Sequence, residues 1–156
     1  EIQGESMDGV RTWFIHRDNL PLLERAADGE INAERTTFLS PFDSLFWAGD
    51  RDQTLWGFKQ LLECYKPAEQ RVYGYLCFPI LYQDRLVGRF DPKLDRQSGV
   101  MTLLALYLEP EIELDDQLVA KVAAAMRDFL SWHGAKSLQI EKSDPPEFGQ
   151  KLLSAL

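Results

Sequence analysis

The sequence has 156 residues with 17 basic and 25 acidic side chains, and its formal net charge at pH 7 is −8. Hydrophobic residues make up 45% of it, which is enough apolar mass for the core of a globular domain. The longest apolar run, residues 103–108, is far shorter than the ~20 residues that span a bilayer, which argues against a membrane-spanning class. The acidic balance also argues against a free-standing nucleic-acid-binding domain, because such domains are more often basic.

The first 28 residues predict a small unit without a core of its own. Residues 1–15 alternate as in a hairpin with an Asp-Gly turn signal at positions 8 and 9, and residues 20–27 predict a short amphipathic helix. A hairpin and one helix need a further surface to pack against. Because the sequence starts at Glu1 inside this hairpin, we expect it to be a piece of a longer protein. The polar residues 29–36 predict a linker.

The middle of the chain predicts a helix followed by an antiparallel sheet. Residues 51–58 carry helix signals, and Gly88 lies inside a strand pattern, which is typical of a β-bulge. Long strands joined by short turns favour a curved meander or a small barrel. We therefore expect an α+β fold with an antiparallel, barrel-like sheet and flanking helices. The strands are predicted at residues 60–66, 71–82, 85–91 and 99–109.

The last third predicts a helix, a strand and a closing helix. Asp115 or Asp116 is expected to cap a helix that ends at His133, with Gly134 as its C′ residue. The acidic run before this helix is expected to be a solvated approach to its N-terminus, where negative charge is favourable. A strand at residues 137–140 and a helix opened by a Pro-Pro pair complete the prediction.

Candidate catalytic and metal-binding residues are few. Cys64 and Cys77 show no CxxC spacing, so we expect reduced thiols, a cytoplasmic location, and neither a metal site nor a cofactor. His16 and His133 are expected to be structural. Three aspartates, Asp43, Asp91 and Asp95, could form a carboxylate cluster, but Asp is a common turn residue and structural roles are favoured.

The charge is distributed unevenly along the chain. Residues 1–50 carry a net charge of −6, residues 51–100 carry +2 and residues 101–156 carry −4. The basic middle combines aromatic residues with arginines, a mixture typical of surfaces that bind single-stranded nucleic acid. The residues are Tyr73, Tyr75, Phe78 and Tyr82 together with Arg71, Arg85 and Arg89. Strand alternation would place Tyr73 and Tyr75 on one face and Phe78 and Tyr82 on the other, so that one pair must lie in the core.

Longer motifs give a family resemblance. The sequence resembles the C-terminal part of the YcaQ/AlkZ-like family of winged-helix DNA glycosylases. The resemblance covers about residues 1–134. It rests on the runs at residues 39–47, 50–58, 66–75 and 84–93, which read LSPFDSLFW, DRDQTLWGF, KPAEQRVYGY and DRLVGRFDPK.

The resemblance implies a domain organisation and an activity. Residues 1–28 would be the last wing and helix of a winged helix, residues 29–36 a linker, and residues 37–156 a C-terminal barrel-like domain. The family excises alkylated or crosslinked bases from DNA by hydrolysis of the N-glycosidic bond. It uses a Gln-x-Gln or Gln-x-Asp pair in its N-terminal region, which Gln3-Gly4-Glu5 does not match. No catalytic residue is therefore assigned here, and we expect the catalytic pair upstream and this piece to be inactive alone.

The expected contribution of this piece is contact with double-stranded DNA. The candidate contacts are the basic residues Lys66, Arg71, Arg85, Arg89 and Lys93, each of which could instead form an ion pair within the protein. Two alternatives stay open at this point. One is a structural or protein-interaction domain with no DNA role, and the other is a barrel that binds a small molecule.

Overall fold

The computed structural model describes residues 2–6 and 9–156 of the chain. Its four helices are α1 (Leu20–Ala27), α2 (Arg51–Trp56), α3 (Asp116–His133) and α4 (Pro146–Ser154). Its strands, as far as the described residues show, are β1 (Ile2–Ser6), β2 (Gly9–Trp13), β3 (Thr36–Phe38), β4 (Phe78–Tyr82), β5 (Arg85–Asp95), β6 (Val100–Leu108), β7 (Ser137–Ile140) and β8 (Ser143–Asp144). The predicted α+β class is confirmed.

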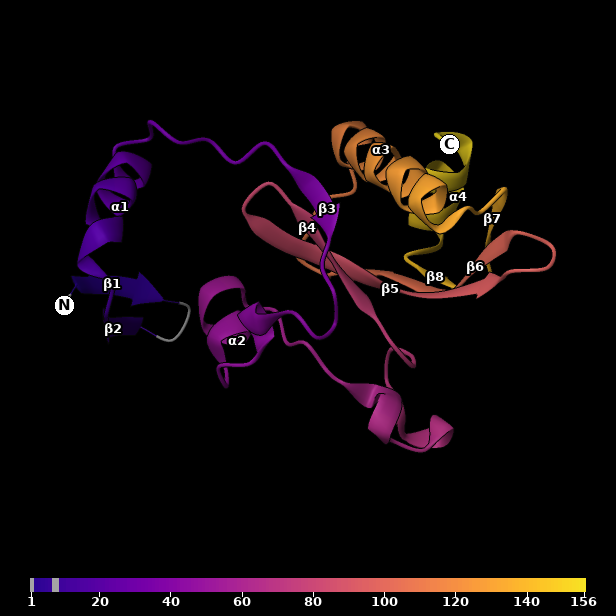
Figure 1. Cartoon of the computed structure of the whole chain (residues 1–156), viewed down its shortest axis with the longest axis horizontal. Coiled ribbons are helices and arrows are strands. Elements are labelled where there is room, and N and C mark those ends of the chain that lie inside the picture. The colour runs from indigo at the N-terminus through magenta and orange to yellow at the C-terminus, as the bar shows by residue number, and fades with distance from the viewer. Residues whose placement is uncertain (1, 7–8) are drawn as a thin grey trace.

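The main sheet is curled and six-stranded, in the order β3-β4-β5-β6-β7, with β8 also paired to β6 (Figure 1). Neighbouring strands from β3 to β6 are antiparallel. The antiparallel order of β4, β5 and β6 agrees with the prediction, whereas β3, at Thr36–Phe38, was not predicted. By contrast, β7 and β8 run parallel to β6. The reason is that α3 lies between β6 and β7 in the chain, and a helical crossover returns the chain in the same direction.

The predicted bulge lies beside Gly88. The register between β4 and β5 shifts at Ile80 and Leu81, so that Val87 is the extra residue. A Cβ atom at Gly88 would meet the backbone of β6, at the carbonyl oxygen of Tyr107 and 3.3 Å from the Cα atom of Leu108. Only glycine allows the two strands to approach so closely, which explains its place inside a strand.

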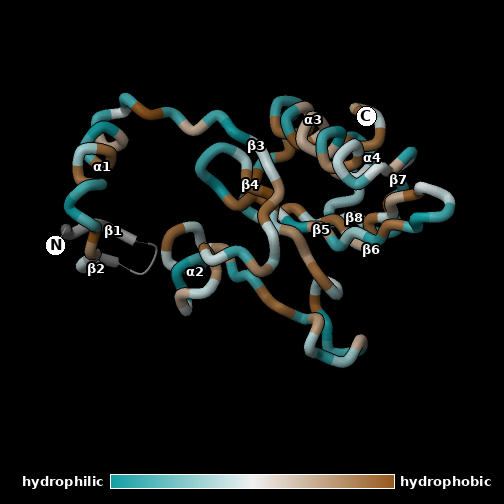
Figure 2. Tube along the Cα trace, viewed as in Figure 1, coloured by the Kyte–Doolittle hydropathy of each residue, from teal (hydrophilic) through white to brown (hydrophobic). Residues whose placement is uncertain are grey.

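The hydrophobic core lies between one face of this sheet and the helices α3 and α4 (Figure 1). Asp115 caps α3, because its Oδ1 atom accepts a hydrogen bond from the amide of Leu118 at 2.7 Å, and Gly134 ends the helix in a left-handed conformation. Phe90 of β5 is surrounded by the rings of Phe38, Phe78 and Phe129. Figure 2 shows hydrophobic residues concentrated along β4 and β6, whereas β5 combines hydrophobic and hydrophilic residues.

The hairpin β1–β2 and the helix α1 form the predicted small N-terminal unit. In Figure 1 they lie at one end of the molecule, and Figure 2 shows a largely hydrophilic stretch between α1 and β3. None of the residues of α1 is buried, and Leu22 is 55% exposed. The apolar residues of α1 are therefore left uncovered, as expected of a helix that packs against another part of a protein. Its assignment to a winged helix, and the domain boundaries at residues 28 and 36, stay predictions.

Two strand predictions in the middle of the chain are wrong. Residues 60–66 form no strand but include a short 3₁₀ turn at Glu63–Tyr65, and of residues 71–82 only Phe78–Tyr82 is a strand. Backbone amides at positions 72, 73, 75 and 76 donate to the side chains of Glu63 and Asp91 and are therefore not available to a strand ladder. Tyr73 and Tyr75 consequently share no strand face, whereas Phe78 and Tyr82 do pack against the core.

Within residues 2–6 and 9–156, no helix has both the length and the apolar character needed to cross a bilayer.

Candidate nucleic-acid interface

The face of the sheet away from α3 and α4 is lined by polar and aromatic side chains. On β5, Phe90 points into the core, and its neighbours Arg89 and Asp91 therefore point to the opposite face, where both are buried. An irregular stretch, residues 59–77, contacts this second face, and we call it the covering segment. Four buried polar side chains hold it there, each through contacts of its own.

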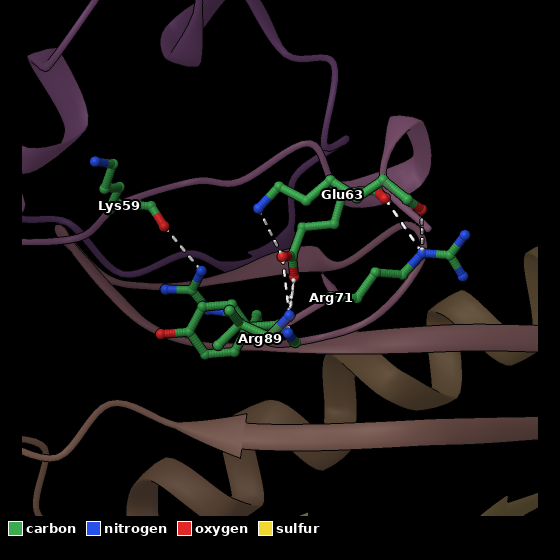
Figure 3. A network of polar contacts seen from close by, with 7 residues as sticks. Lys59, Glu63, Arg71 and Arg89 are labelled. Carbon is green, nitrogen blue, oxygen red and sulfur yellow. Dashed lines mark hydrogen bonds and ion pairs between the residues drawn. The ribbon is translucent and has the colours of Figure 1, made fainter. Parts of the chain in front are cut away.

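Arg89 is the most enclosed of these side chains. It is 1% exposed, and the centre of its guanidinium lies 4.0 Å from the ring centroids of both Phe58 and Tyr73. Its Nη2 atom donates to Oε1 of Glu109 at 2.7 Å. Its Nη1 atom donates to the carbonyl oxygen of Lys59 at 2.8 Å (Figure 3). A buried cation needs such partners because its desolvation is costly. Arg89 thus ties β5 to the start of the covering segment, and its guanidinium is withdrawn from the surface.

Glu63 holds the middle of the covering segment. Its carboxylate is 2% exposed and accepts hydrogen bonds from the amide of Tyr73 at 2.7 Å, from the amide of Val72 at 2.9 Å and from Nζ of Lys66 at 3.2 Å (Figure 3). Burial by itself raises the pKa of this carboxyl, but the amide and Lys66 hydrogen bonds outweigh it, so that the pKa lies below the ordinary value of 4.5. The carboxylate is therefore ionised at neutral pH.

Asp91 holds the end of the covering segment. Its two carboxylate oxygens accept from the amides of Tyr75 at 2.6 Å and Leu76 at 3.2 Å. Gly74 lies directly against this side chain, and a Cβ atom at that position would lie 2.8 Å from both Cβ and Cγ of Asp91. The Gly74 position therefore has no room for a side chain while Asp91 keeps its bonds.

Asp52 and Gln60 join the covering segment to α2. The Oδ2 atom of Asp52 accepts from the amide of Gln60 at 2.6 Å, and the side-chain amide of Gln60 donates to the carbonyl oxygen of Cys77 at 3.0 Å. Cys77 is itself buried, and burial together with the nearby Asp91 charge raises the pKa of its thiol to about 12. This thiol is therefore un-ionised and unreactive at neutral pH.

The remaining basic candidates lie on or beside the second face. Arg85 begins β5 and is exposed, and Lys93 is exposed on the same face as Arg89 and Asp91 by strand alternation. Lys66 is partly exposed and paired with Glu63. Arg71 is partly exposed and donates from Nε to the carbonyl oxygens of Lys66 at 3.0 Å and Glu63 at 3.3 Å (Figure 3). Of the five candidates, Arg85 and Lys93 are exposed, and Lys66 and Arg71 are partly exposed and bonded within the protein. Arg89 alone of the five is buried.

Two residues outside the basic middle of the sequence also lie at this face. Lys142 follows β7, and its Nζ atom lies 3.2 Å from the hydroxyl of Tyr107 and 5.1 Å from that ring's centroid. Lys142, Tyr107 and Arg71 line one concavity of about 370 Å³ with Tyr73 and Tyr75. Lys142 could not be placed here from the sequence, because it reaches Tyr107 of β6 through the parallel pairing of β8 with β6.

The three aspartates do not meet in a cluster. Asp43 accepts from the amide of Leu45 at 2.9 Å, and Asp95 accepts from the amide of Gln97 and the hydroxyl of Ser98, so each stabilises its own turn. Asp91 is bound to the covering segment, so each of the three aspartates makes hydrogen bonds that stabilise its own part of the fold. Among the residues that the structure describes, no group of three or more His, Cys, Asp and Glu side chains could hold a metal ion.

Comparison with known families identifies the chain. Residues 1–132 match the family described as DNA glycosylase AlkZ-like. The chain belongs to this family. The suspected resemblance is thereby confirmed, and it connects the protein with DNA glycosylases, with DNA repair and with DNA as a partner. No solved structure matches the chain.

The sequence motifs that resemble this AlkZ-like family have a defined place in the structure. The run at residues 66–75 forms part of the covering segment, and the run at residues 84–93 covers most of β5. Hydrogen bonds from the amides of Tyr75 and Leu76 to Asp91 and the stacking of Arg89 on Tyr73 connect the two. Residues of these two motifs therefore make contacts that hold the covering segment on the sheet.

Proposed function

We propose that this portion of the protein contacts double-stranded DNA and serves as a scaffold in a DNA-repair glycosylase. Such an enzyme hydrolyses the N-glycosidic bond of an alkylated or crosslinked base. The observation that carries the proposal is membership of the AlkZ-like family over residues 1–132. The exposed cations of the second face support it, because they belong to the basic middle of the chain, where a phosphate backbone would be attracted rather than repelled.

We assign this portion of the protein no direct part in the cleavage of the N-glycosidic bond. Alkylation at a ring nitrogen makes the base a cationic leaving group, so that the remaining tasks are to position a water and to stabilise positive charge on the sugar. The sequence offers no match to the family's glutamine pair, and we expect no base release from these 156 residues alone. The role that we assign to Arg71, Arg85, Lys66 and Lys93 is electrostatic attraction and positioning of the duplex.

Arg89 takes no part in this proposed contact. Its guanidinium is enclosed by two rings and by Glu109, and releasing it would leave Glu109 without its partner. We assign it the task of keeping the covering segment in place. Arg85 has two carboxylates close by, since Glu109 and Glu111 line the same cleft of about 390 Å³. Arg71 and Lys93 are accordingly the stronger candidates for phosphate contacts.

The DNA contact is tested by the salt dependence of affinity in the full-length protein. We expect the double variant Arg71→Ala/Lys93→Ala to bind duplex DNA more weakly and to flatten the slope of log affinity against log salt by about 0.9 for each phosphate that is no longer neutralised. The matched control is Lys121→Ala/Lys136→Ala, which removes two exposed charges elsewhere. If both double variants change the slope equally, the assigned face is wrong. If neither does, this portion is a structural or protein-interaction domain.

The assignment of catalysis is tested by base release. The full-length protein should release an alkylated base from duplex DNA, and the 156-residue chain should not. Release by this chain alone would overturn our view of where the catalytic groups lie, while no release by either would overturn the enzymatic part of the proposal.

A further inference from the structure

The concavity between the covering segment and β6 combines tyrosine rings with two cations, and we call it the tyrosine–cation pocket. It is lined by Arg71, Tyr73, Tyr75, Tyr107 and Lys142 and has a volume of about 370 Å³. We propose that this pocket binds a nucleotide that is unpaired and outside the base stack of a DNA strand. The inference rests on the proposed function, because it specifies which part of the DNA this face would recognise.

Three tyrosines, Tyr73, Tyr75 and Tyr107, supply aromatic surface to the pocket. Tyr75 is 49% exposed, and the guanidinium of Arg71 lies over its ring at 4.9 Å from the centroid. Tyr73 and Tyr107 meet edge to face with their centroids 5.3 Å apart, which fixes both rings. The exposed ring surface of Tyr75 is therefore the one on which a base could stack, with the other two rings beside it.

Two cations, Arg71 and Lys142, line the pocket. In the described part of the chain, the hydrogen bonds of the Arg71 side chain run through Nε to two carbonyl oxygens, which leaves the donors of its two terminal amino groups for a ligand. Lys142 lies over the ring of Tyr107, and its Nζ atom donates to that tyrosine's hydroxyl. Asp91 also lines the pocket, and both of its carboxylate oxygens accept hydrogen bonds from backbone amides. An anionic group between Arg71 and Lys142 would thus meet two donors.

These features favour an unpaired nucleotide over a paired one. In a duplex the base faces are covered by their neighbours, and only phosphates and groove edges are open to a protein. An unpaired base exposes its ring face to an aromatic side chain, and its phosphate can reach a nearby cation. The pocket falls within the range of roughly 300–1,000 Å³ for sites that hold small ligands. A pocket with rings and cations therefore suits a single displaced nucleotide.

The pocket is tested with two labelled duplexes of one sequence, one fully paired and one with a single unpaired nucleotide. Anisotropy titrations of the full-length protein should give tighter binding to the bulged duplex, by roughly 5- to 150-fold for one stacked base. Tyr75→Ala should abolish this preference and leave affinity for the paired duplex unchanged. Tyr65→Ala is the matched control, because Tyr65 is a tyrosine of the same covering segment, 81% exposed, that does not line the pocket.

The outcomes separate this inference from the function on which it rests. If the wild-type protein binds both duplexes equally, the tyrosine–cation pocket is refuted while the DNA contact stands. If it binds neither, the DNA contact itself fails and the pocket with it. If Tyr65→Ala and Tyr75→Ala reduce the preference equally, the site lies elsewhere. Competition by thymidine monophosphate supports the proposal, whereas equal competition by inorganic phosphate would show an anion site without base stacking and would overturn it.

Discussion

The two faces of the main sheet are stabilised in different ways. The face under α3 and α4 is apolar, and its side chains interlock with one another, so that each residue has many neighbours of the same kind. The face under the covering segment depends on Arg89, Glu63 and Asp91, each of which satisfies particular backbone groups or a particular charge. Because burial of apolar surface is the dominant favourable term in folding, we expect the first face to account for most of the stability. The second face fixes the shape of a segment that has no strand or α-helix.

This difference predicts unequal responses to substitution. A change on the apolar face alters the stability of the whole domain because the core is shared by the sheet and both helices. A change on the second face breaks interactions between single partners and should act first on the covering segment. The following variants test that contrast, from the largest expected effect to the smallest.

The largest effect is expected from Phe90→Ala. Phe90 is fully buried among three other phenylalanine rings, so truncation removes apolar packing and leaves a cavity. We expect the free energy of unfolding in urea to fall by about 3–5 kcal/mol. Phe42→Ala is the control, because Phe42 is 45% exposed and its truncation should be far less destabilising. Equal losses of unfolding free energy for the two variants would contradict the placement of the core.

A smaller effect is expected from Arg89→Met, which keeps much of the apolar stem but removes the guanidinium. Glu109 then loses its partner, and the carbonyl of Lys59 loses its donor. Since Glu109 keeps 24% of its side-chain exposure, water can replace part of this interaction, and we expect the unfolding free energy to fall by about 1.5–3 kcal/mol. Arg89→Lys should recover little, because an ammonium cannot stack between two rings or donate in a fork. Full recovery by lysine would show that only the charge matters.

The smallest effect is expected from the protonation of Glu63. Its pKa is lowered on folding, so its stabilising contribution is fully present above its unfolded-state pKa near 4.5 and is lost as the pH falls through the lower folded-state value. The difference in unfolding free energy between wild type and Glu63→Gln should therefore shrink as the pH drops below about 4.5. Lys66→Gln is the companion variant, since it removes the ion-pair partner but leaves both amide bonds. A difference that stays constant down to about pH 3 would contradict the assigned role of the carboxylate.

The sequence predicted the apolar face well and the second face poorly. The cap at Asp115 and the glycine at position 134 located α3, and alternation with turn signals located β5 and β6 to within a few residues. These features repeat along the chain, so a local pattern is sufficient to find them. The family motifs also pointed to residues 66–75 and 84–93 as important, although not to what they do.

The errors on the second face share one cause. Residues 71–77 have the composition of a strand, but their amides donate to Glu63 and Asp91, which lie 9 to 16 positions away in the chain. Arg89 was a candidate for DNA contact, and nothing local indicates that Glu109 and two rings would enclose it. Lys142 reaches Tyr107 only through the pairing of β8 with β6. Such interactions depend on the completed fold and leave no periodic signal.

The most direct test of the contrast between the faces is amide hydrogen exchange in native conditions. We predict that the amides of Val72, Tyr73, Tyr75 and Leu76 exchange slowly in the wild-type protein although they belong to no strand. In Asp91→Ala the amides of Tyr75 and Leu76 should exchange at least about tenfold faster, while those of β6 and α3 keep their protection. If these amides already exchange in the wild type as fast as the exposed residues 30–34, side-chain hydrogen bonds do not hold the covering segment, and the account is wrong.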